Sequence, residues 1–316
     1  MKRWLWPVLL LIPASLSGQI SLQERLFDVP YVPTKPEVVA SMLRMAKVTK
    51  NDILYDLGCG DGRIVITAAQ LYGIRGVGID IDAERIRESR ENAAVAKVEH
   101  LVKFIEQDLF QADFSEATVV SLYLLTSVNL RLRPILLRQL RPGTRIVSHN
   151  YAMDTWKPDD STVVMVNEQS HSVYFWVVPA NLSGIWKGTW ADGGQASNFS
   201  LKIEQHFQWP GGTMNLEGTE IWLSAIRLSG DRLEFTAKSE DDASIPRLVF
   251  TGRASGNEMK GTVDIIRLDG QNSRRSWKAK RDPQTAKALD VEKWEESPGP
   301  WDRGFMFPAE GPCPFR

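Results

Sequence analysis

The sequence predicts an α/β domain with a seven-stranded, mostly parallel sheet, followed by a small antiparallel β sandwich or barrel. Between about residues 37 and 179, short apolar runs alternate with segments of helical spacing, the pattern of a parallel sheet crossed by helices. A turn with three glycines in five residues, 58–62, separates the first apolar run from a helical segment. After residue 181 the helical patterns stop, and short alternating runs with turn signals such as PGG, SGD and LDG take over.

The strands of the sheet are predicted from apolar runs bounded by turn residues. The five runs of the parallel part are 53–57, 76–81, 102–107, 119–124 and 145–150. Two further β-rich runs, STVVMV and SVYFWVV, are separated by NEQSH and predict a closing hairpin.

Helical spacing appears first at Val39, Met42, Leu43 and Ala46. In TKPE just before it, Thr34 and Glu37 predict a capping box that starts this helix. The other helical segments are RIVITAAQLYG, DAERIRESRENAAVA and NLRLRPILLRQL, and the last is expected to carry its proline near the first turn.

The β-rich region is expected to span 181–282, with a Pro-rich tail at 283–316. It opens with SGIWKGTW and closes with SWKAKR, which is faintly similar to calycin-type barrels. In that interpretation Trp186 packs beneath Arg281 and closes the barrel base through a cation–π contact. One G-x-W is a weak signal, so the favoured interpretation is that the tryptophans at 186, 190, 222 and 277 simply fill a small core.

The N-terminus has the three parts of an export signal. Lys2 and Arg3 precede the apolar run WLWPVLLLIP and the small residues ASLSG. The sequence therefore predicts a signal peptide or anchor over 1–18 and an exported or membrane-associated protein, with the domain containing the sheet over 19–180. A location on the cytoplasmic face is the alternative.

Composition excludes some classes of partner and site. The net charge is -1 and 43% of residues are hydrophobic, so no nucleic-acid partner is expected. With two cysteines and four scattered histidines, neither a disulfide nor a metal site is expected.

The glycine turn reads D-x-G-x-G-x-G, with Asp56 before Gly58, Gly60 and Gly62. A dinucleotide fingerprint needs its third glycine at position 63, which is Arg63. A carboxylate placed before the turn suits a cationic or amine-bearing ligand better than a pyrophosphate.

Two more acids follow the next two predicted strands. Asp80 closes the second strand, where a carboxylate accepts hydrogen bonds from ribose hydroxyls, and Asp108 follows the third. With Asp56, three acids lie at three successive strand ends and are expected to converge on one crevice. A ligand with an amino group, a ribose and an adenine but no phosphate is S-adenosylmethionine.

The series DLGCGDGR, GVGIDID and EQDLF resembles the motifs of class I, seven-stranded S-adenosylmethionine-dependent methyltransferases, with a Rossmann-like sheet over roughly residues 28–178. The resemblance implies that Asp56 and the Gly58–Gly60 turn hold the methionine portion, Asp80 the ribose and Asp108 the adenine edge. The alternative is a Rossmann-like fold that binds another nucleotide or has lost its ligand.

Two stretches, DVPYVPTKPEVV and the segment after the fourth strand, look like those of the protein-lysine methyltransferases that lack a SET domain. In that group an N-terminal loop folds over the cofactor, and Tyr31 and Thr34 match it here. Tyr31 could equally be a packing residue in a Pro-rich segment.

The segment after the fourth strand also bears on the methyl acceptor. It reads LLTSVN where enzymes acting on base or amide nitrogens carry (N/D/S)-P-P-(Y/F), so planar amino nitrogens are disfavoured. Tyr123 and Asn129 flank the expected transfer position and could orient the nucleophile. Alternatively, Tyr123 is a core residue and Asn129 a helix cap.

The sequence therefore predicts an S-adenosylmethionine-dependent methyltransferase, with a protein lysine or a small molecule as acceptor. A lysine must lose a proton from a group with an ordinary pKa of about 10.4, and desolvation favours the neutral amine. The absence of an obvious general base therefore does not count against this prediction. The competing class is an exported binding protein with a vestigial methyltransferase domain.

Overall fold

The computed structural model describes residues 29–192, 195–239, 242 and 244–290, without the side chains of 192–196. The predicted signal segment and most of the predicted tail lie outside these residues. Contacts divide the chain into two units, Met1–Tyr31 and Val32–Arg316. In the described part of the chain, no helix is long and apolar enough to cross a membrane.

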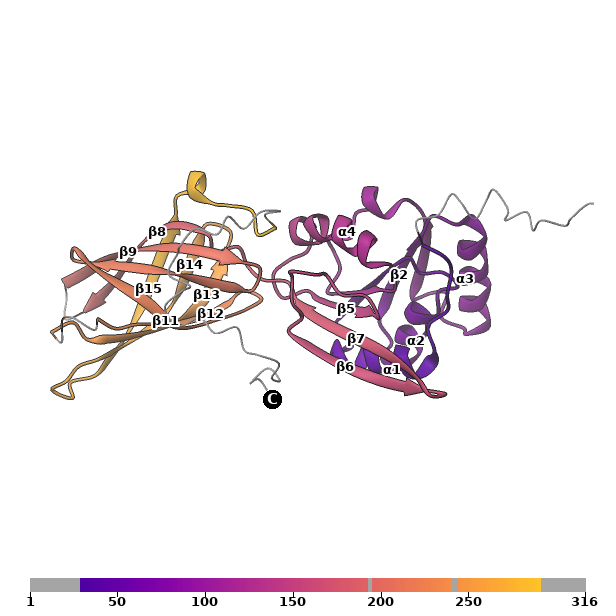
Figure 1. Cartoon of the computed structure of the whole chain (residues 1–316), viewed down its shortest axis with the longest axis horizontal. Coiled ribbons are helices and arrows are strands. Elements are labelled where there is room, and N and C mark those ends of the chain that lie inside the picture. Colours follow the sequence, from indigo (N-terminus) through magenta and orange to yellow (C-terminus); the bar gives the residue numbers. More distant parts are fainter. Residues whose placement is uncertain (1–28, 193–194, 240–241, 243, 291–316) are drawn as a thin grey trace, which may run out of the picture. The chain divides into compact units, whose positions relative to one another are not determined.

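The sheet has seven strands in the order β3-β2-β1-β4-β5-β7-β6, which confirms the predicted sheet. Its first five strands are parallel, and β7 runs antiparallel to both β5 and β6 (Figure 1). The strands are β1 (Ile53–Leu57), β2 (Arg75–Asp80), β3 (Val102–Glu106), β4 (Val119–Leu122), β5 (Arg145–His149), β6 (Asp160–Val166) and β7 (Gln169–Val177).

Register brings the carboxyl ends of the central strands to one edge. Leu57 on β1 pairs with Ile79 on β2 and with Leu122 on β4. Both β1 and β4 are buried along almost their whole length, as apolar runs in a parallel sheet require. The residues that follow β1, β2 and β4 therefore lie side by side, at the edge where open α/β sheets bind ligands.

Helices cover both faces of the sheet. They are α1 (Pro36–Met45), α2 (Arg63–Tyr72), α3 (Ala83–Val95) and α4 (Thr126–Gln139), with a 3-10 turn η2 (Leu109–Gln111). Helix α2 contacts both α1 and α3, and α4 lies on the opposite side of the sheet from α1 and α2 (Figure 1).

The predicted capping box at α1 is wrong. The N-cap is Lys35, no side chain caps the helix, and Pro36 occupies its first turn. Proline has no N–H to satisfy and presets the helical φ, so the helix starts without a side-chain cap. The hydroxyl of Thr34 instead lies 3.3 Å from His149 Nδ1.

The predicted start of α4 is also wrong. The helix begins at Thr126 rather than Asn129, so Pro134 lies in its interior instead of its first turn. Burial of Leu132 and Leu136 sustains a helix that local propensity would have shortened. Asn129 is consequently inside the helix and not at its cap.

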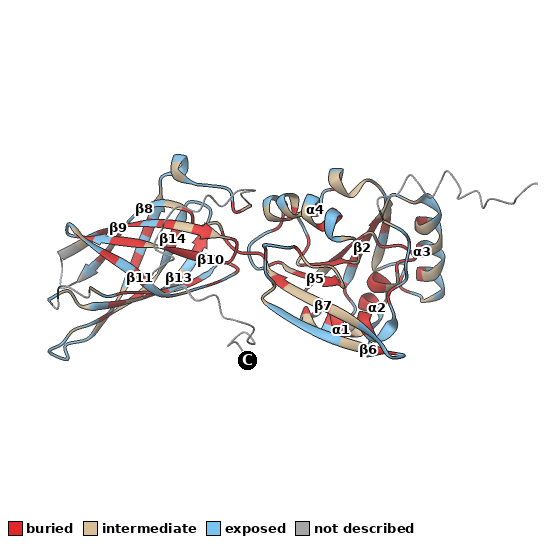
Figure 2. Cartoon of the chain, in the orientation of Figure 1, coloured by how far each residue is buried: buried red, intermediate tan, exposed pale blue. Residues whose placement is uncertain are grey.

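The β-rich region is a closed antiparallel barrel and not a sandwich. Each strand pairs with the next along the chain and the last, β15, closes on β8. The strands are β8 (Gly184–Asp192), β9 (Gln195–His206), β10 (Trp209–Leu216), β11 (Thr219–Ser229), β12 (Arg232–Ala237), β13 (Arg247–Ser255), β14 (Glu258–Ile266) and β15 (Ser273–Arg281). Buried and exposed residues alternate along them (Figure 2).

Aromatic side chains fill the inside of the barrel. Trp190, Phe199 and Phe250 contact one another with ring centroids 5.2 to 5.8 Å apart. Phe235 stacks on Phe250 at 4.6 Å, and Trp277 meets Phe250 edge-on at 5.4 Å. This packing agrees with the interpretation of the tryptophans as core residues for three of the four.

The fourth, Trp222, is 55% exposed, so its assignment to the core is wrong. It lies between buried Ile221 and Leu223 on β11, and the two-residue period of a strand turns it outward. The contact expected from the calycin-like pattern is present, because the guanidinium of Arg281 lies 5.0 Å from the centroid of the Trp186 ring.

Candidate functional site

The turn after β1 contains three positions that only glycine can occupy without strain. Gly58, Gly60 and Gly62 have φ values of 82°, 52° and 79°, the left-handed region that side chains disfavour. A Cβ on Gly58 would lie 2.7 Å from Leu124 Cδ2, and one on Gly62 would lie 2.7 Å from the Phe104 ring. The turn therefore presents bare backbone at the edge of the sheet.

Asp80 fastens this turn to the end of β2. Its Oδ2 accepts from Gly60 N at 2.8 Å and its Oδ1 accepts from Asp82 N at 3.0 Å. Burial raises the pKa of Asp80 despite these bonds. A carboxylate has about four lone-pair sites, so each oxygen keeps acceptor capacity for a ribose hydroxyl.

Asp56 lies beneath the turn and not in an open crevice. It is 2% exposed, and its Oδ1 accepts from Ser121 Oγ on β4 at 2.7 Å. Burial, with Asp80 and Asp61 nearby, raises its pKa to about 7. Its influence on a bound cation is therefore electrostatic, exerted through the turn.

Asp108 stands beside Asp80 along the sheet edge, since Gln107 N donates to the Asp80 carbonyl at 2.9 Å. Its carboxylate caps η2, accepting from Phe110 N at 2.9 Å and from Gln111 Nε2 at 3.1 Å. The predicted acids thus lie at the ends of three neighbouring strands, but only Asp80 and Asp108 are partly exposed.

Arg63 joins the turn to the loop before α1, a role that the sequence analysis missed. It forms an ion pair with Asp61 and donates from an Nη to the Thr34 carbonyl at 2.8 Å. The segment with Thr34, expected to fold over the cofactor, is thereby held at the start of α2. Tyr31 is 45% exposed and belongs to the other unit of the chain, so its role stays a prediction.

Tyr123 and Asn129, the candidates for acceptor positioning, differ in access. The Tyr123 ring lies 3.8 Å from the His149 ring and 6.2 Å from Tyr151, and burial raises its pKa. Asn129 is completely buried and its Nδ2 donates to the Tyr151 carbonyl at 3.0 Å. Asn129 can therefore act only by holding the segment that carries Tyr151.

Two histidines at the same edge were not singled out by the sequence analysis. His149 is the last residue of β5, and its Nε2 lies 2.9 Å from Nδ1 of His171 on β7. Their closeness depends on the pairing of β5 with β7, which no local pattern reveals. Within the described residues, no cluster of three or more His, Cys, Asp or Glu could hold a metal ion.

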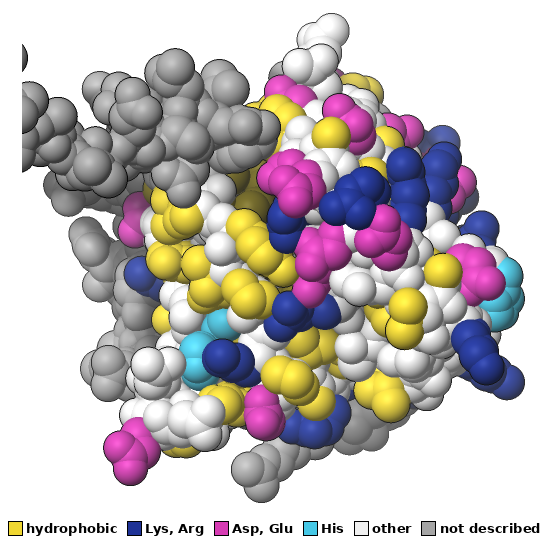
Figure 3. All heavy atoms as spheres, turned by 90° about the vertical axis from the view of Figure 1, so that its right-hand side faces the viewer, with side chains coloured by type: hydrophobic (Ala, Val, Ile, Leu, Met, Phe, Trp, Pro, Cys, Tyr) yellow, Lys and Arg dark blue, Asp and Glu magenta, His cyan; other side chains and the backbone are white. Residues whose placement is uncertain are grey.

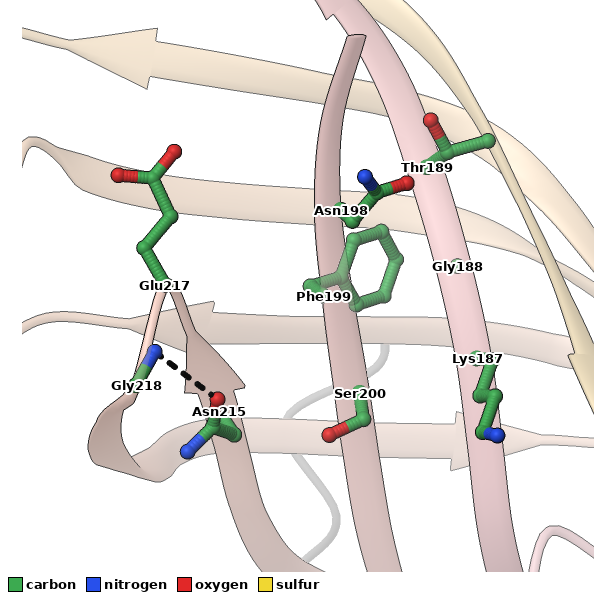
Figure 4. Close-up of a pocket in the computed structure, with 9 residues that line it drawn as sticks. All are labelled: Lys187, Gly188, Thr189, Asn198, Phe199, Ser200, Asn215, Glu217 and Gly218. Carbon is green, nitrogen blue, oxygen red and sulfur yellow. Dashed lines mark hydrogen bonds between the residues drawn. The ribbon is translucent and has the colours of Figure 1, made fainter.

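A groove of about 710 Å³ lies elsewhere, on the barrel (Figure 4). It is lined mainly by polar side chains of β8, β9 and β10, including Lys187, Asn198 and Asn215. None of the predicted site residues lines it. The face of the molecule in Figure 3 carries acidic and basic side chains side by side.

The residues at the sheet edge fit the ligand that the motifs imply. The left-handed glycines of the turn place backbone rather than side chains at the edge, Asp80 retains acceptor capacity, and Asp56 supplies negative charge beneath the turn. A sheet of this strand order with such an edge defines a class I S-adenosylmethionine-dependent methyltransferase.

Comparisons with known proteins agree. The ANTKMT methyltransferase domain matches residues 56–160. The chain is 46% identical over 151 residues to a protein-lysine N-methyltransferase of Saccharolobus islandicus. The aligned region covers 48% of this chain and 94% of that protein. The chain is 30% identical over 148 residues to the adenine nucleotide translocase lysine N-methyltransferase of Mus musculus, covering 46% of this chain and 62% of that protein.

Among solved structures, an RNA methyltransferase from Salinibacter ruber with S-adenosyl-L-homocysteine is 54% identical, with a TM-score of 0.44 over 46% of this chain and 93% of that one. The similarity to these sequence relatives shows that the chain belongs to the class I methyltransferases, in the lysine-methyltransferase-like group. Its methyl donor is S-adenosylmethionine.

The raised pKa of Asp56 predicts that cofactor affinity depends on pH. Folding raises this pKa from 3.8 to about 7, so the ligand-free fold loses stability as the pH rises from 3.8 to about 7 and loses no more above it. A cationic ligand favours the ionised form. We therefore expect affinity for S-adenosylmethionine to increase with pH up to about 7, by at most about tenfold per pH unit, and to level off above it.

Calorimetric titrations from pH 5.5 to 8.5 (about one unit or more on each side of that pKa) measure this dependence. Asp56→Asn removes the titrating group and should flatten the curve. An unchanged slope in the variant would assign the titration to another group.

Proposed function

We propose that this chain transfers a methyl group from S-adenosylmethionine to the ε-amino group of lysine in a protein. The observation that carries the proposal is the 46% identity to a protein-lysine N-methyltransferase, 94% of which the chain covers. The translocase lysine methyltransferase supports the same acceptor class at lower identity.

Side chains at the sheet edge support an amine acceptor. Tyr123, just after β4, and Tyr151, just after β5, have ring centroids 6.2 Å apart, and the Tyr123 ring contacts His149. Aromatic faces favour a cationic or amine group and provide apolar walls. The (N/D/S)-P-P-(Y/F) motif that suits planar nitrogens is replaced by LLTSVN.

The chemistry is an in-line displacement at the methyl carbon. S-adenosylmethionine supplies an activated methyl group on a sulfonium, so the chain mainly positions donor and acceptor. Asp80 and the Gly58–Gly60 turn orient the donor. Desolvation beside Tyr123 favours the neutral lysine amine, the form with a free electron pair.

The experiment is methyl transfer from tritiated S-adenosylmethionine to hen lysozyme as a lysine-containing probe. Lysozyme with its lysines reductively dimethylated is the matched control acceptor, and total RNA and a mixture of small amines are parallel acceptors. We expect label in native lysozyme alone, recovered as methyl-lysine after hydrolysis. Label in RNA, in small amines alone, or equally in the blocked protein would contradict the proposal.

A further inference from the structure

Three polar side chains form a continuous array beside the proposed site. The Thr34 hydroxyl lies 3.3 Å from His149 Nδ1, and His149 Nε2 lies 2.9 Å from His171 Nδ1. They come from the loop before α1, the end of β5 and the first part of β7. Three separate elements therefore supply one chain of hydrogen bonds.

The array is fixed to the site at two points. The Thr34 carbonyl accepts from Arg63, at the start of α2 just after the glycine turn. The His149 ring packs against Tyr123 with centroids 3.8 Å apart. Thr34 is 3% exposed and His149 is 1% exposed, so water does not replace these bonds.

One end of the array is open. His171 Nε2 is buried and has no hydrogen-bond partner among the described residues. Buried polar atoms almost always have a partner, so an orphan of this kind calls for an explanation. Each neutral imidazole has one nitrogen that accepts a hydrogen bond and one that donates. The hydrogen bonds of the array can therefore all point from Thr34 toward His171 or all point the opposite way.

We propose that Thr34, His149 and His171 form a proton relay that deprotonates the acceptor lysine, an inference that rests on the proposed function. The lysine ammonium gives a proton to Thr34 Oγ1, whose own proton passes to His149 Nδ1. His149 Nε2–H then passes its proton to His171 Nδ1. The charge ends on His171, whose buried and unpartnered Nε2 is the atom from which the proton leaves.

The methyl-transfer step that follows conserves atoms and charge. The neutral amine nitrogen uses its electron pair to form the N–CH₃ bond, and the bond from the methyl carbon to sulfur breaks. The sulfonium charge is transferred to the methylated ammonium, S-adenosylhomocysteine leaves as the neutral thioether, and the proton already removed is the third product. No further reactant is required.

The surroundings of His149 keep its ring neutral, so that it can accept a proton. Burial and the neighbouring His171 lower its pKa to about 4, so it is neutral at pH 7. The titratable groups that face it in the described structure are His171 from β7, Tyr123 after β4 and, beyond it, Tyr151 after β5. No carboxylate among the described residues acts on its pKa to hold a proton there.

The test compares His171→Gln with wild type across pH in full-length protein, using lysozyme as acceptor. Glutamine can retain a hydrogen bond to His149 but cannot carry the proton onward. We expect kcat at pH 7 to fall about a hundredfold, a typical loss for proton-transfer groups. Near pH 10, close to the ordinary lysine pKa of about 10.4, kcat should approach that of the wild type.

Controls distinguish a relay from a structural role. The affinity for S-adenosylmethionine should be unchanged in His171→Gln, and His100→Gln, at an exposed histidine away from the site, should behave as wild type. An equal loss of kcat at every pH, or no loss at all, would overturn the relay. A wild-type protein that methylates no probe would instead overturn the proposed function.

Nitrogen-15 NMR of the histidine rings in ligand-free protein tests the array without a substrate. At pH 7 we expect His149 to be neutral and mostly in one tautomer, with that ratio altered in His171→Gln. A charged His149, or a solvent-like mixture of tautomers that the variant does not change, would contradict the array.

Discussion

Replacing Asp80 with alanine is expected to weaken S-adenosylmethionine binding by at least about a hundredfold. The variant loses the acceptor for the ribose hydroxyls and the anchor at Gly60 N, which lies 2.8 Å from Asp80 Oδ2. Each hydrogen bond to a charged group contributes about 1.5–3 kcal/mol, so loss of two has this effect. Calorimetric titration of the full-length protein measures it.

Asp82→Ala is the matched control, because Asp82 is two residues away and caps α3 by accepting from Glu84 N at 2.8 Å. It should lower stability by about 1 kcal/mol and leave cofactor affinity nearly unchanged. Equal losses in both variants would show that the binding defect comes from disturbance of the β2–α3 turn rather than from the Asp80 carboxylate.

Replacing Trp277 with alanine is expected to destabilise the barrel by about 3–5 kcal/mol. The side chain is 3% exposed, packs edge-on against Phe250, and donates from Nε1 to the Thr251 and Thr262 carbonyls at 3.1 Å each. Thermal unfolding followed by tryptophan fluorescence measures the loss.

The same variant tests the predicted division into domains 19–180 and 181–282. If the sheet folds by itself, the variant keeps wild-type affinity for S-adenosylmethionine at 20 °C (about the temperature of maximum stability for many domains). Trp222→Ala, at an exposed barrel position, is the control and should change stability little. Loss of cofactor binding together with the barrel would contradict the division.

Local sequence was sufficient for the sheet and for the glycine turn at its edge. The strands of a parallel sheet are buried on both faces and appear as apolar runs, so β1, β4 and β5 could be placed within about two residues. The glycines at 58 and 60 mark positive φ, and Asp80 ends a strand at the binding edge. Each of these signals is carried by a few adjacent residues.

The errors came where packing overrides local preference. Thr34 fits the first position of a capping box, but its hydroxyl is next to His149 and Pro36 starts the helix. Pro134 is a helix breaker by propensity, yet α4 continues through it over a buried apolar face. Tryptophan is a residue type usually found in the core, but the alternation of side chains along β11 turns Trp222 outward.

The proposed acceptor side could not be predicted because its contacts are distant in sequence. His149 and His171 meet only through the pairing of β5 with β7, and Arg63 reaches back to the Thr34 carbonyl. The hypothesis of a binding protein built around the barrel also depended on packing. Aromatic rings fill the barrel interior, which leaves its outer groove as the candidate surface.

A crystal structure of the full-length protein with S-adenosyl-L-homocysteine tests the central claim most directly. The predicted result places the ribose hydroxyls on the Asp80 carboxylate and the homocysteine portion against the Gly58–Gly60 turn. A ligand bound elsewhere, or a well-ordered sheet edge that takes up no ligand at saturating concentration, would contradict the assignment of this edge as the cofactor site.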